Sequence, residues 1–298
     1  MRAFYDLPAP AKLNLFLHVV GRRADGYHLL QSVFVLIDWA DVLHVERRDD
    51  GRLQRHDLGA RLPDDDLTLR AARALQAASG SPLGADLHVD KRVPWAAGLG
   101  GGSSDAATAL LALNRLWGLG WPLDRLLALG ATLGADVPFF LGGRNAFVEG
   151  IGERLAPIDV PPLGFAVVKP DAGLATAEIF AHPGLARDTK PVILAGFLED
   201  AARPGFWEAG QGWGRNDLQP PAEDRCPAVA EAARWLERRF GNSRMTGSGS
   251  AVFARTGLTS GMAALPEATW PAEDPLPPGW VGRMCRSLEQ HPLVGWAG

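Results

Sequence analysis

The stretch GLGGGSSDAA at residues 98–107 places the tightest limit on how this chain can fold. Glycine fills four of its first five positions, and the stretch runs directly into AATALLALNRLWGL, whose apolar spacing predicts a helix. Glycine loses the most conformational entropy on folding, so this cluster indicates that bare backbone is needed here. Because a helix N-terminus presents unpaired amides and partial positive charge, the expected neighbour is a phosphate.

Two serines follow the glycines. Ser103 and Ser104 are expected to offer hydroxyls to phosphate oxygens or to Mg²⁺ and to cap the helix, while a tight turn with a serine cap is the purely structural alternative. The spacing excludes GxxxxGK[ST] and GxGxxG, and the protein-kinase signatures HRD and DFG do not occur. Asp105 would repel a phosphate unless its side chain points away or meets the metal.

The segment AKLNLFLHVVG alternates and predicts a strand with one mixed, functional face. The alternation places Ala11, Leu13, Leu15, Leu17 and Val19 on one face, with Lys12, Asn14, Phe16 and His18 on the other. A lone strand lysine is more often exposed to solvent than catalytic, so a solvent-exposed Lys12 is the alternative to a functional one.

Asp136 lies in the apolar segment GADVPFF, where desolvation raises a carboxyl pKa and a nearby ammonium lowers it. If Lys12 is that partner, the pair keeps the aspartate ionised and aims it at a substrate hydroxyl. The alternative is that Asp136 caps a helix or orders a turn before Pro138.

The remaining elements favour an α+β fold, since strands and helices mix without a regular βαβ alternation. One or two strands follow the Asp25-Gly26 turn, and prolines at residues 157–164 suggest domains at 1–158 and 159–298. MTGSGSAVF at 245–253 predicts a second glycine turn that passes close to another loop or to ligand. The other expected helices cover 64–80, with Asp64 to Asp66 at the first N-terminus, 106–119, 123–133 and 227–241. The other strands lie within 85–94, 165–170, 250–255 and 272–287, and an irregular segment extends to Gly214.

Composition excludes several classes of protein. Thirty basic and 34 acidic residues give a net charge of -4, which disfavours a nucleic-acid partner. The two cysteines form no CxxC pair, HExxH is absent, and Asp136 and Pro138 interrupt the most apolar stretch. With no signal-peptide pattern at the N-terminus, we expect a cytoplasmic protein without a membrane partner.

Four segments together resemble the GHMP family of small-molecule kinases. They are PAPAKLNLFL, VPWAAGLGGGSSDAATALLALN, LGADVPFF and MTGSGSAVFA, in the family's order. The resemblance implies an N-terminal domain like ribosomal protein S5 and a ferredoxin-like C-terminal domain. It also implies transfer of the ATP γ-phosphate, with Mg²⁺, to the 2-hydroxyl of a methylerythritol joined to cytidine by a diphosphate, in non-mevalonate isoprenoid biosynthesis.

By the same resemblance, Asp136 is the base, Lys12 is its partner and a phosphate contact, and Tyr27 and Phe180 stack on the cytosine that His28 hydrogen-bonds. Asn14 and Thr176 complete the substrate-binding set. The resemblance leaves the protein ligands of the metal unidentified. The expected ATP-binding residues are Pro94, Trp95, Ala96, Ala97, Gly98, Leu99, Gly100, Gly101, Gly102, Ser103, Ser104, Asp66, Gly247, Ser248 and Gly249.

The chain departs from the family pattern at three places. Trp95, Ala96 and Ala97 stand where relatives carry more glycine, Asp66 stands where asparagine is common, and residues 185–225 match poorly. The alternatives are a GHMP kinase for homoserine or mevalonate, which does not need Tyr27, His28 and Phe180, and a nucleotide-binding sensor without turnover. The sequence predicts no oligomeric state.

Overall fold

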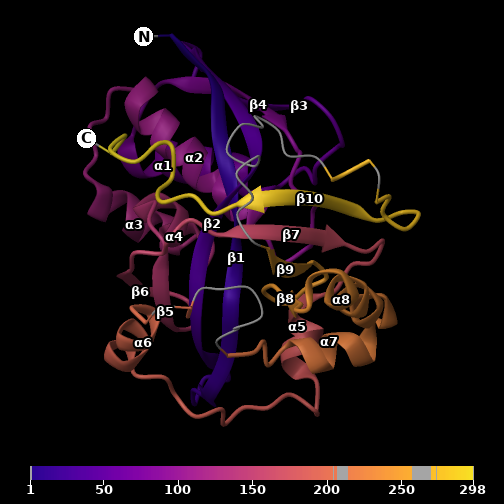
Figure 1. Cartoon of the computed structure of the whole chain (residues 1–298). Helices are drawn as coiled ribbons and strands as arrows, with labels where there is room; N and C mark the ends of the chain where they lie inside the picture. Colours follow the sequence, from indigo (N-terminus) through magenta and orange to yellow (C-terminus); the bar gives the residue numbers. More distant parts are fainter. Residues whose placement is uncertain (1, 204, 207–213, 257–269, 273, 298) are drawn as a thin grey trace.

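Two long antiparallel strands, β1 (Ala3–Arg22) and β2 (His28–Arg48), run through the whole molecule (Figure 1). The computed structural model describes residues 2–203, 205–206, 214–256, 270–272 and 274–297. A turn with Gly26 at φ 93° joins the two strands, as the Asp25-Gly26 pair predicts. One or two strands were expected after this turn, and the segment from Leu29 to Glu46 lies in the single strand β2.

A register shift between Asn14 and Leu17 changes which side chains of β1 share a face. The bulge leaves Phe16 packed with Leu13 and Leu15, while Leu17 lines the same cavity as Lys12 and Asn14. The expected strict alternation was therefore wrong beyond Asn14.

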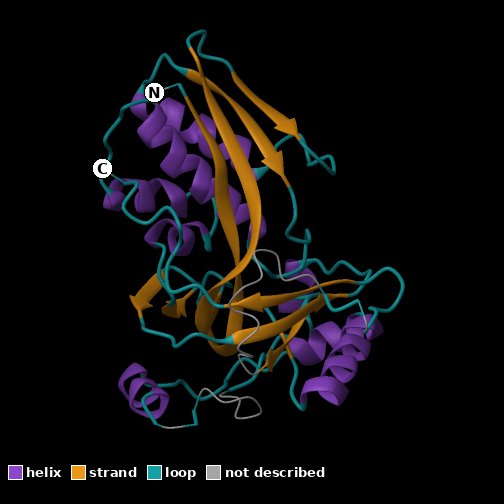
Figure 2. Cartoon of the chain, turned by 45° about the horizontal axis from the view of Figure 1, so that its top comes forward, coloured by secondary structure: helices purple, strands orange, loops and turns teal. Residues whose placement is uncertain are grey.

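The first sheet has the order β3-β4-β2-β5-β6, with β1 paired to β2. A cluster of buried apolar side chains joins this sheet to the helices that follow its strands, so the helices cover one of its faces (Figure 2). The other elements of this half are β3 (Leu53–Asp57), α1 (Leu67–Ser79), β4 (Gly84–Asp90), α2 (Gly101–Leu116), α3 (Leu123–Ala131), α4 (Val137–Gly142), β5 (Ala146–Gly150) and β6 (Arg154–Pro157).

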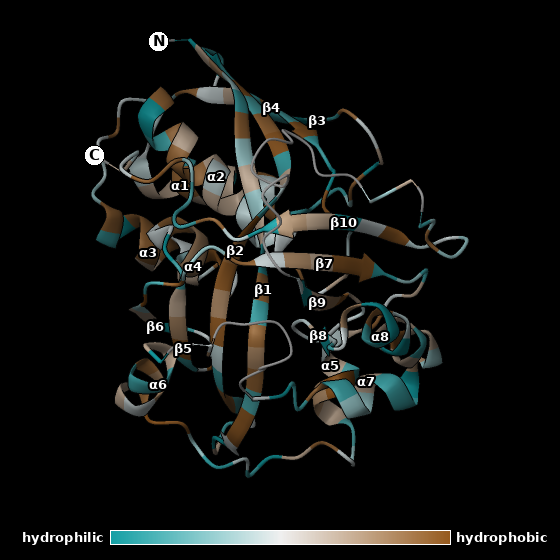
Figure 3. Ribbon diagram, in the orientation of Figure 1, coloured by the Kyte–Doolittle hydropathy of each residue, from teal (hydrophilic) through white to brown (hydrophobic). Residues whose placement is uncertain are grey.

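The second sheet is antiparallel, with the order β10-β7-β9-β8. Its strand β7 alternates: Phe165 and Val167 pack toward the first sheet, and Ala166 and Val168 pack toward α8. Figure 3 shows hydrophobic colour along β7 and hydrophilic residues on α8. The elements of this half are β7 (Gly164–Lys169), α5 (Thr176–Ala181), α6 (Leu194–Ala201), α7 (Gln219–Arg225), α8 (Pro227–Phe240), β8 (Arg244–Met245), β9 (Val252–Thr256) and β10 (Val281–Arg286).

The α+β class and the main expected elements are confirmed. Two differences concern helices: α2 begins at Gly101, five residues earlier than expected, and α5 and α6 occupy the segment expected to be irregular, part of which lies outside the described residues. β6 ends at Pro157 and β7 begins at Gly164, and the boundary after residue 158 stays a prediction. Within the described ranges, no helix has the length and apolar character needed to span a bilayer.

A buried histidine follows β10 and predicts an acid sensitivity of the fold. The Nδ1 of His291 accepts a hydrogen bond from the Leu293 amide, and burial lowers the pKa of His291 to about 4. Because the unfolded chain binds a proton at its ordinary pKa of 6.5, His291 contributes stability that is complete above pH 6.5 and is lost as the pH falls toward 4.

We expect His291→Gln to remove this dependence. Urea unfolding at pH 7 and pH 4.5 should show that the wild-type free energy of unfolding loses about 2.5 kcal/mol more than that of the variant. Equal losses in the two proteins would mean that His291 does not titrate differently in the folded and unfolded states.

Candidate active site

The glycine segment alternates between core and cavity. Ala97 and Leu99 are buried in the apolar cluster between the two sheets, whereas Ala96, Gly98 and Gly100 line a cavity of about 370 Å³. Of the expected ATP residues, Ala97 and Leu99 therefore offer a ligand only their backbone.

The start of α2 leaves backbone donors near this cavity. The first intrahelical hydrogen bond runs from the Ser104 amide to the Gly100 carbonyl at 3.0 Å, so the amides of Gly101, Gly102 and Ser103 have no acceptor within the helix. Gly100 itself is the N-cap, at φ 72°, and no side chain among the described residues caps the helix. The expectation that serines cap α2 was wrong, because both serines lie in its first turn.

Ser103 and Ser104 have different surroundings. The Ser104 hydroxyl is buried without a hydrogen-bond partner in the described structure, and its expected contact with phosphate or metal stays a prediction. The Ser103 side chain is half-buried and lies beside Gly134, two residues before Asp136. Ser103 is thus the hydroxyl that faces the segment of the expected base.

The two glycine turns are pressed together. A Cβ on Gly98 would stand 2.3 Å from the Thr246 carbonyl oxygen, and one on Gly247 would stand 2.8 Å from the Gly98 carbonyl oxygen. The Ala251 amide also donates to the Ala97 carbonyl at 3.1 Å. This confirms that the second glycine turn passes close to another loop, and it explains why both turns need glycine.

Lys12 and Asp136 form the predicted pair. The Lys12 Nζ lies 3.6 Å from the Asp136 carboxylate, and the lysine side chain is only 4% exposed. The Lys12 amide donates to the Leu99 carbonyl at 2.9 Å, and its side chain lies against Gly100, so the glycine segment fixes the lysine. Burial lowers the pKa of Lys12, and the Asp136 charge opposes this shift.

Asp136 remains accessible beside its buried partner. Its side chain is 29% exposed and lines the cavity, and it makes no capping hydrogen bond to α4 within the described residues. The alternative interpretations, an exposed lysine and a capping aspartate, are therefore wrong. A carboxylate held beside an ammonium and open to a cavity can accept a proton from a bound hydroxyl.

Most of the remaining expected site residues line the same cavity. Asn14 lines this cavity. Its side-chain amide group donates to the Ser32 hydroxyl at 2.9 Å, and its side-chain carbonyl accepts from the Lys12 ammonium. Thr176 and Ser248 meet at 2.7 Å between their hydroxyl oxygens. The expected residues on the cavity wall are Lys12, Asn14, Ala96, Gly98, Gly100, Asp136, Thr176, Phe180, Gly247, Ser248 and Gly249.

A second pocket, of about 800 Å³, adjoins the first and shares Thr176 and Phe180 with it. Tyr27, 61% exposed, and His28 line this second pocket. The rings of His28 and Phe180 stack at 5.0 Å between centroids, so His28 covers one face of Phe180. Burial and the charges of Arg187 and Arg22 lower the pKa of His28, which favours the neutral imidazole.

Asp105 points away from the cavity. Its carboxylate lies 2.7 Å from the Lys91 Nζ, and the buried Asp41 contacts the same ammonium. Asp41 also accepts hydrogen bonds from the backbone amides of Arg92 and Val93. These bonds fix the backbone just before the glycine segment. Burial raises the pKa of Asp105 well above its usual range, and the Lys91 ammonium opposes this shift. The side chain of Asp105 therefore faces Lys91 and not a phosphate in the cavity.

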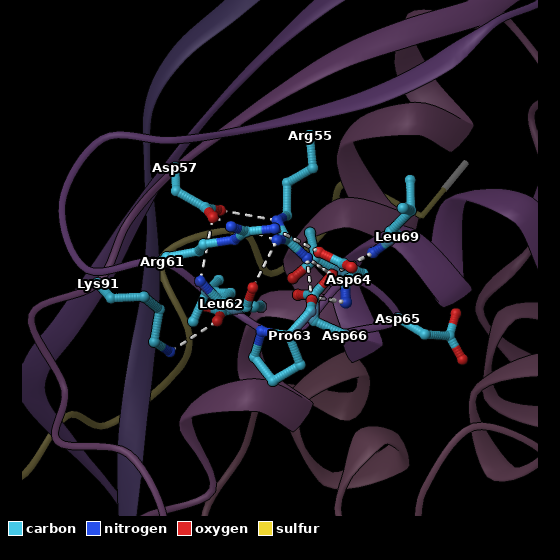
Figure 4. Close-up of polar contacts among 12 residues, drawn as sticks. Arg55, Asp57, Arg61, Leu62, Pro63, Asp64, Asp65, Asp66, Leu69 and Lys91 are labelled. Carbon is cyan, nitrogen blue, oxygen red and sulfur yellow. Dashed lines mark hydrogen bonds and ion pairs between the residues drawn. The ribbon is translucent and has the colours of Figure 1, made fainter.

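Asp66 performs a structural task in this arrangement. Its carboxylate accepts from the amides of Thr68 and Leu69 as the N-cap of α1 and pairs with Arg55 at 2.7 Å. Figure 4 shows Arg55 between Asp57 and Asp66. Asp66 does not line either of the two pockets, and its expected contact with ATP stays a prediction. Pro94 and the exposed Trp95 also lie outside both linings.

Sequence reasoning missed two residues in the poorly matching region. The Asn216 amide group donates to the carbonyls of Met245 and Gly247, both at 2.8 Å, and so fixes the second glycine turn. Arg187 donates to His28. Asn216 lies in the polar doublet Asn216-Asp217, the one local signal that could have drawn attention to it.

The comparisons with known proteins agree with this geometry. The model of the GHMP kinases N terminal domain matches residues 66–144, and that of the GHMP kinases C terminal matches residues 195–260. Together with the α+β fold and the site, these matches define the chain as a small-molecule kinase of the GHMP class.

A protein of Methylibium petroleiphilum named 4-diphosphocytidyl-2-C-methyl-D-erythritol kinase is 60% identical to this chain over 299 residues, covering 100% of the chain and 99% of the relative. The chain thus belongs to the 4-diphosphocytidyl-2-C-methyl-D-erythritol kinase family. A crystal structure of 4-(cytidine 5'-diphospho)-2C-methyl-D-erythritol kinase matches at TM-score 0.71 and 38% identity, covering 84% of this chain and 89% of that one. A homoserine kinase structure from Cytophaga hutchinsonii matches at TM-score 0.64 but 16% identity, over 98% and 96% of the two chains, which shows the fold alone.

Proposed function

We propose that this protein transfers the γ-phosphate of ATP to the 2-hydroxyl of 4-diphosphocytidyl-2-C-methyl-D-erythritol, giving the 2-phosphate and ADP in non-mevalonate isoprenoid biosynthesis. The observation that carries the proposal is the Lys12–Asp136 pair, held in a cavity that both glycine turns line and that opens into the aromatic pocket of Tyr27, His28 and Phe180. The first cavity suits the phosphates, and the second suits the cytidine.

Phosphoryl transfer depends on positioning and charge neutralisation, since its transition state is loose and spreads charge over the phosphoryl oxygens. The amides at the start of α2 and the Lys12 ammonium are the groups available for that charge. Asp136 orients the attacking hydroxyl and accepts its proton late, as the new bond forms. The Lys12 ammonium lies 3.6 Å from this carboxylate and supplies its counter-charge.

We assign Mg²⁺ to the Asp136 side of the cavity. Mg²⁺ in kinases is held by one or two carboxylates, with substrate phosphates and waters completing the shell. Asp136 is left to the substrate hydroxyl, so the Ser103 hydroxyl beside its segment would complete the metal's shell together with the phosphates and waters. When bound, the metal supplies positive charge to the phosphate oxygens.

We also propose a cytoplasmic location. Both cysteines, Cys226 and Cys285, are free thiols, which is usual in a reducing compartment, and the cytoplasm supplies ATP.

The substrate is tested by incubating the protein with ATP, Mg²⁺ and a panel containing the cytidine substrate, homoserine and mevalonate. Phosphorus NMR then locates the new phosphate. We expect product only from the cytidine substrate, phosphorylated at its 2-hydroxyl. Product from homoserine or mevalonate alone would favour the other GHMP kinases, and ATP binding without ADP release would favour a sensor.

The aromatic pocket gives a separate prediction. Tyr27→Ala and Phe180→Ala should each raise the KM for the cytidine substrate about 5- to 150-fold, because stacking on a base contributes about 1 to 3 kcal/mol. The KM for ATP and the kcat should change little. Steady-state kinetics in both substrates test this, with the exposed Tyr5→Ala, outside both pockets, as a control. Unchanged substrate KM in both variants would remove the cytidine from this pocket.

A further inference from the structure

Arg187 connects the helix that carries Phe180 to the strand that begins with His28. Its guanidinium donates to the carbonyls of Phe180 at 3.1 Å, His182 at 2.9 Å and Leu185 at 3.0 Å. The first two carbonyls lie at the C-terminal end of α5, where backbone acceptors lack helical partners and a cation is favoured. Its Nε donates to the Nε2 of His28 at 3.2 Å.

The direction of this last hydrogen bond is fixed by chemistry. A guanidinium has five N–H donors and no acceptor, and it stays protonated in proteins. His28 Nε2 must therefore be the acceptor, and the single proton of the neutral imidazole must lie on Nδ1. Arg187 thus selects one of the two tautomers of His28.

The selected tautomer gives the pocket a hydrogen-bond donor. His28 lines the second pocket, and its ring stacks on Phe180 at an interplanar angle of 27°. No hydrogen bond occupies its Nδ1 among the described residues. The Nδ1–H can donate to an acceptor atom of a bound base. Cytosine and uracil differ at ring N3, which is an acceptor in cytosine and a donor in uracil.

We propose that Arg187 is a positioning residue that makes the site specific for cytidine, by holding His28 in the Nδ1–H tautomer against Phe180. This inference rests on the proposed function, since it assigns the base recognised at the same site. A uridine substrate would set the N3–H donor against the His28 donor and leave both without an acceptor, which is costly in a desolvated pocket.

The tautomer is tested on the ligand-free protein, so this part does not depend on the substrate. Nitrogen-15 NMR of imidazole-labelled protein at pH 7.5 should show His28 with a protonated Nδ1 in the wild type. Arg187→Met should show a mixture of tautomers. Protonation of Nε2 in the wild-type protein would overturn the proposal, whatever reaction the enzyme performs.

Specificity is tested by comparing kcat/KM for the cytidine substrate and its uridine analogue. Arg187→Met should lower the preference for cytidine about tenfold, acting through KM for the substrate and not through KM for ATP. Arg187→Lys, which keeps a donor without an acceptor, should retain the preference to the extent that it retains the Nδ1–H signal. Arg234→Met, at an exposed position on α8, is the matched control and should change neither quantity.

Two results would contradict the specificity claim: an unchanged cytidine preference in Arg187→Met once its tautomer is mixed, or a loss of activity on both nucleotides in equal proportion. The second result would assign Arg187 a merely structural task. Failure of the wild-type protein to phosphorylate the cytidine substrate would refute the proposed function instead, and the NMR result would still stand.

Discussion

Replacing Asp136 by asparagine should leave ATP binding intact and lower kcat about 10²- to 10⁴-fold, the usual cost of a lost general base. Asparagine is nearly the same size as aspartate and keeps a hydrogen-bonding oxygen, but it cannot take the proton of the attacking hydroxyl. It also leaves the buried Lys12 without its counter-charge at 3.6 Å. Coupled measurement of ADP release gives kcat, and calorimetry gives the affinity for ATP.

The matched control is Asp159→Asn, because the side chain of Asp159 is 95% exposed and pairs only with Arg144 in the described structure. This variant should retain wild-type turnover. Near-normal turnover in Asp136→Asn would remove Asp136 from the mechanism, and loss of ATP affinity would show that its main task is to bind the nucleotide.

The second large effect concerns stability. Gly98→Ala should lower the free energy of unfolding by about 3 to 5 kcal/mol, since alanine at φ 77° is strained and its Cβ would stand 2.3 Å from the Thr246 carbonyl. Because that neighbour is backbone, the two glycine turns must separate to admit a methyl group. Nucleotide affinity should fall with the same substitution.

Gly80→Ala separates the cost of backbone strain from the cost of the clash between the two glycine turns. Gly80 ends α1 at φ 66°, and a Cβ there meets nothing within 4 Å, so only the backbone strain of about 1 to 2 kcal/mol remains. Denaturant unfolding of both variants provides the comparison. If the two variants lose equal stability, contact between the glycine turns does not constrain the fold.

Local chemistry made part of this site predictable from sequence. The glycine cluster before an apolar helix indicates exposed amides, and Asp136 in apolar surroundings demands a partner of opposite charge, which Lys12 supplies at 3.6 Å. The end of α1 at Gly80 follows from the preference for glycine after a helix. These features depend on residues close to one another in sequence, or on one strong charge requirement.

What sequence reasoning missed depends on long-range packing. The bulge after Asn14 that moves Leu17 to the cavity has no local signature, and the burial of Ser104 depends on which residue begins α2. Arg187 can donate to His28 only because the end of α5 packs against the start of β2. The two residues are 159 positions apart in the sequence. Most arginines on a surface make no such contact, so composition and spacing do not single it out.

The continuous ribbon of β1 and β2 has a mechanical consequence. Both sheets contribute to one apolar cluster, in which Val33 and Ile37 of β2 meet Phe165 and Phe253. The Asn14 amide also donates to the Thr246 hydroxyl, which joins the two halves beside the cavity. A hinge motion that separated the two halves would have to disrupt this shared apolar cluster. We therefore expect substrates to enter and products to leave through rearrangement of surface segments around a cleft whose walls keep their spacing throughout turnover.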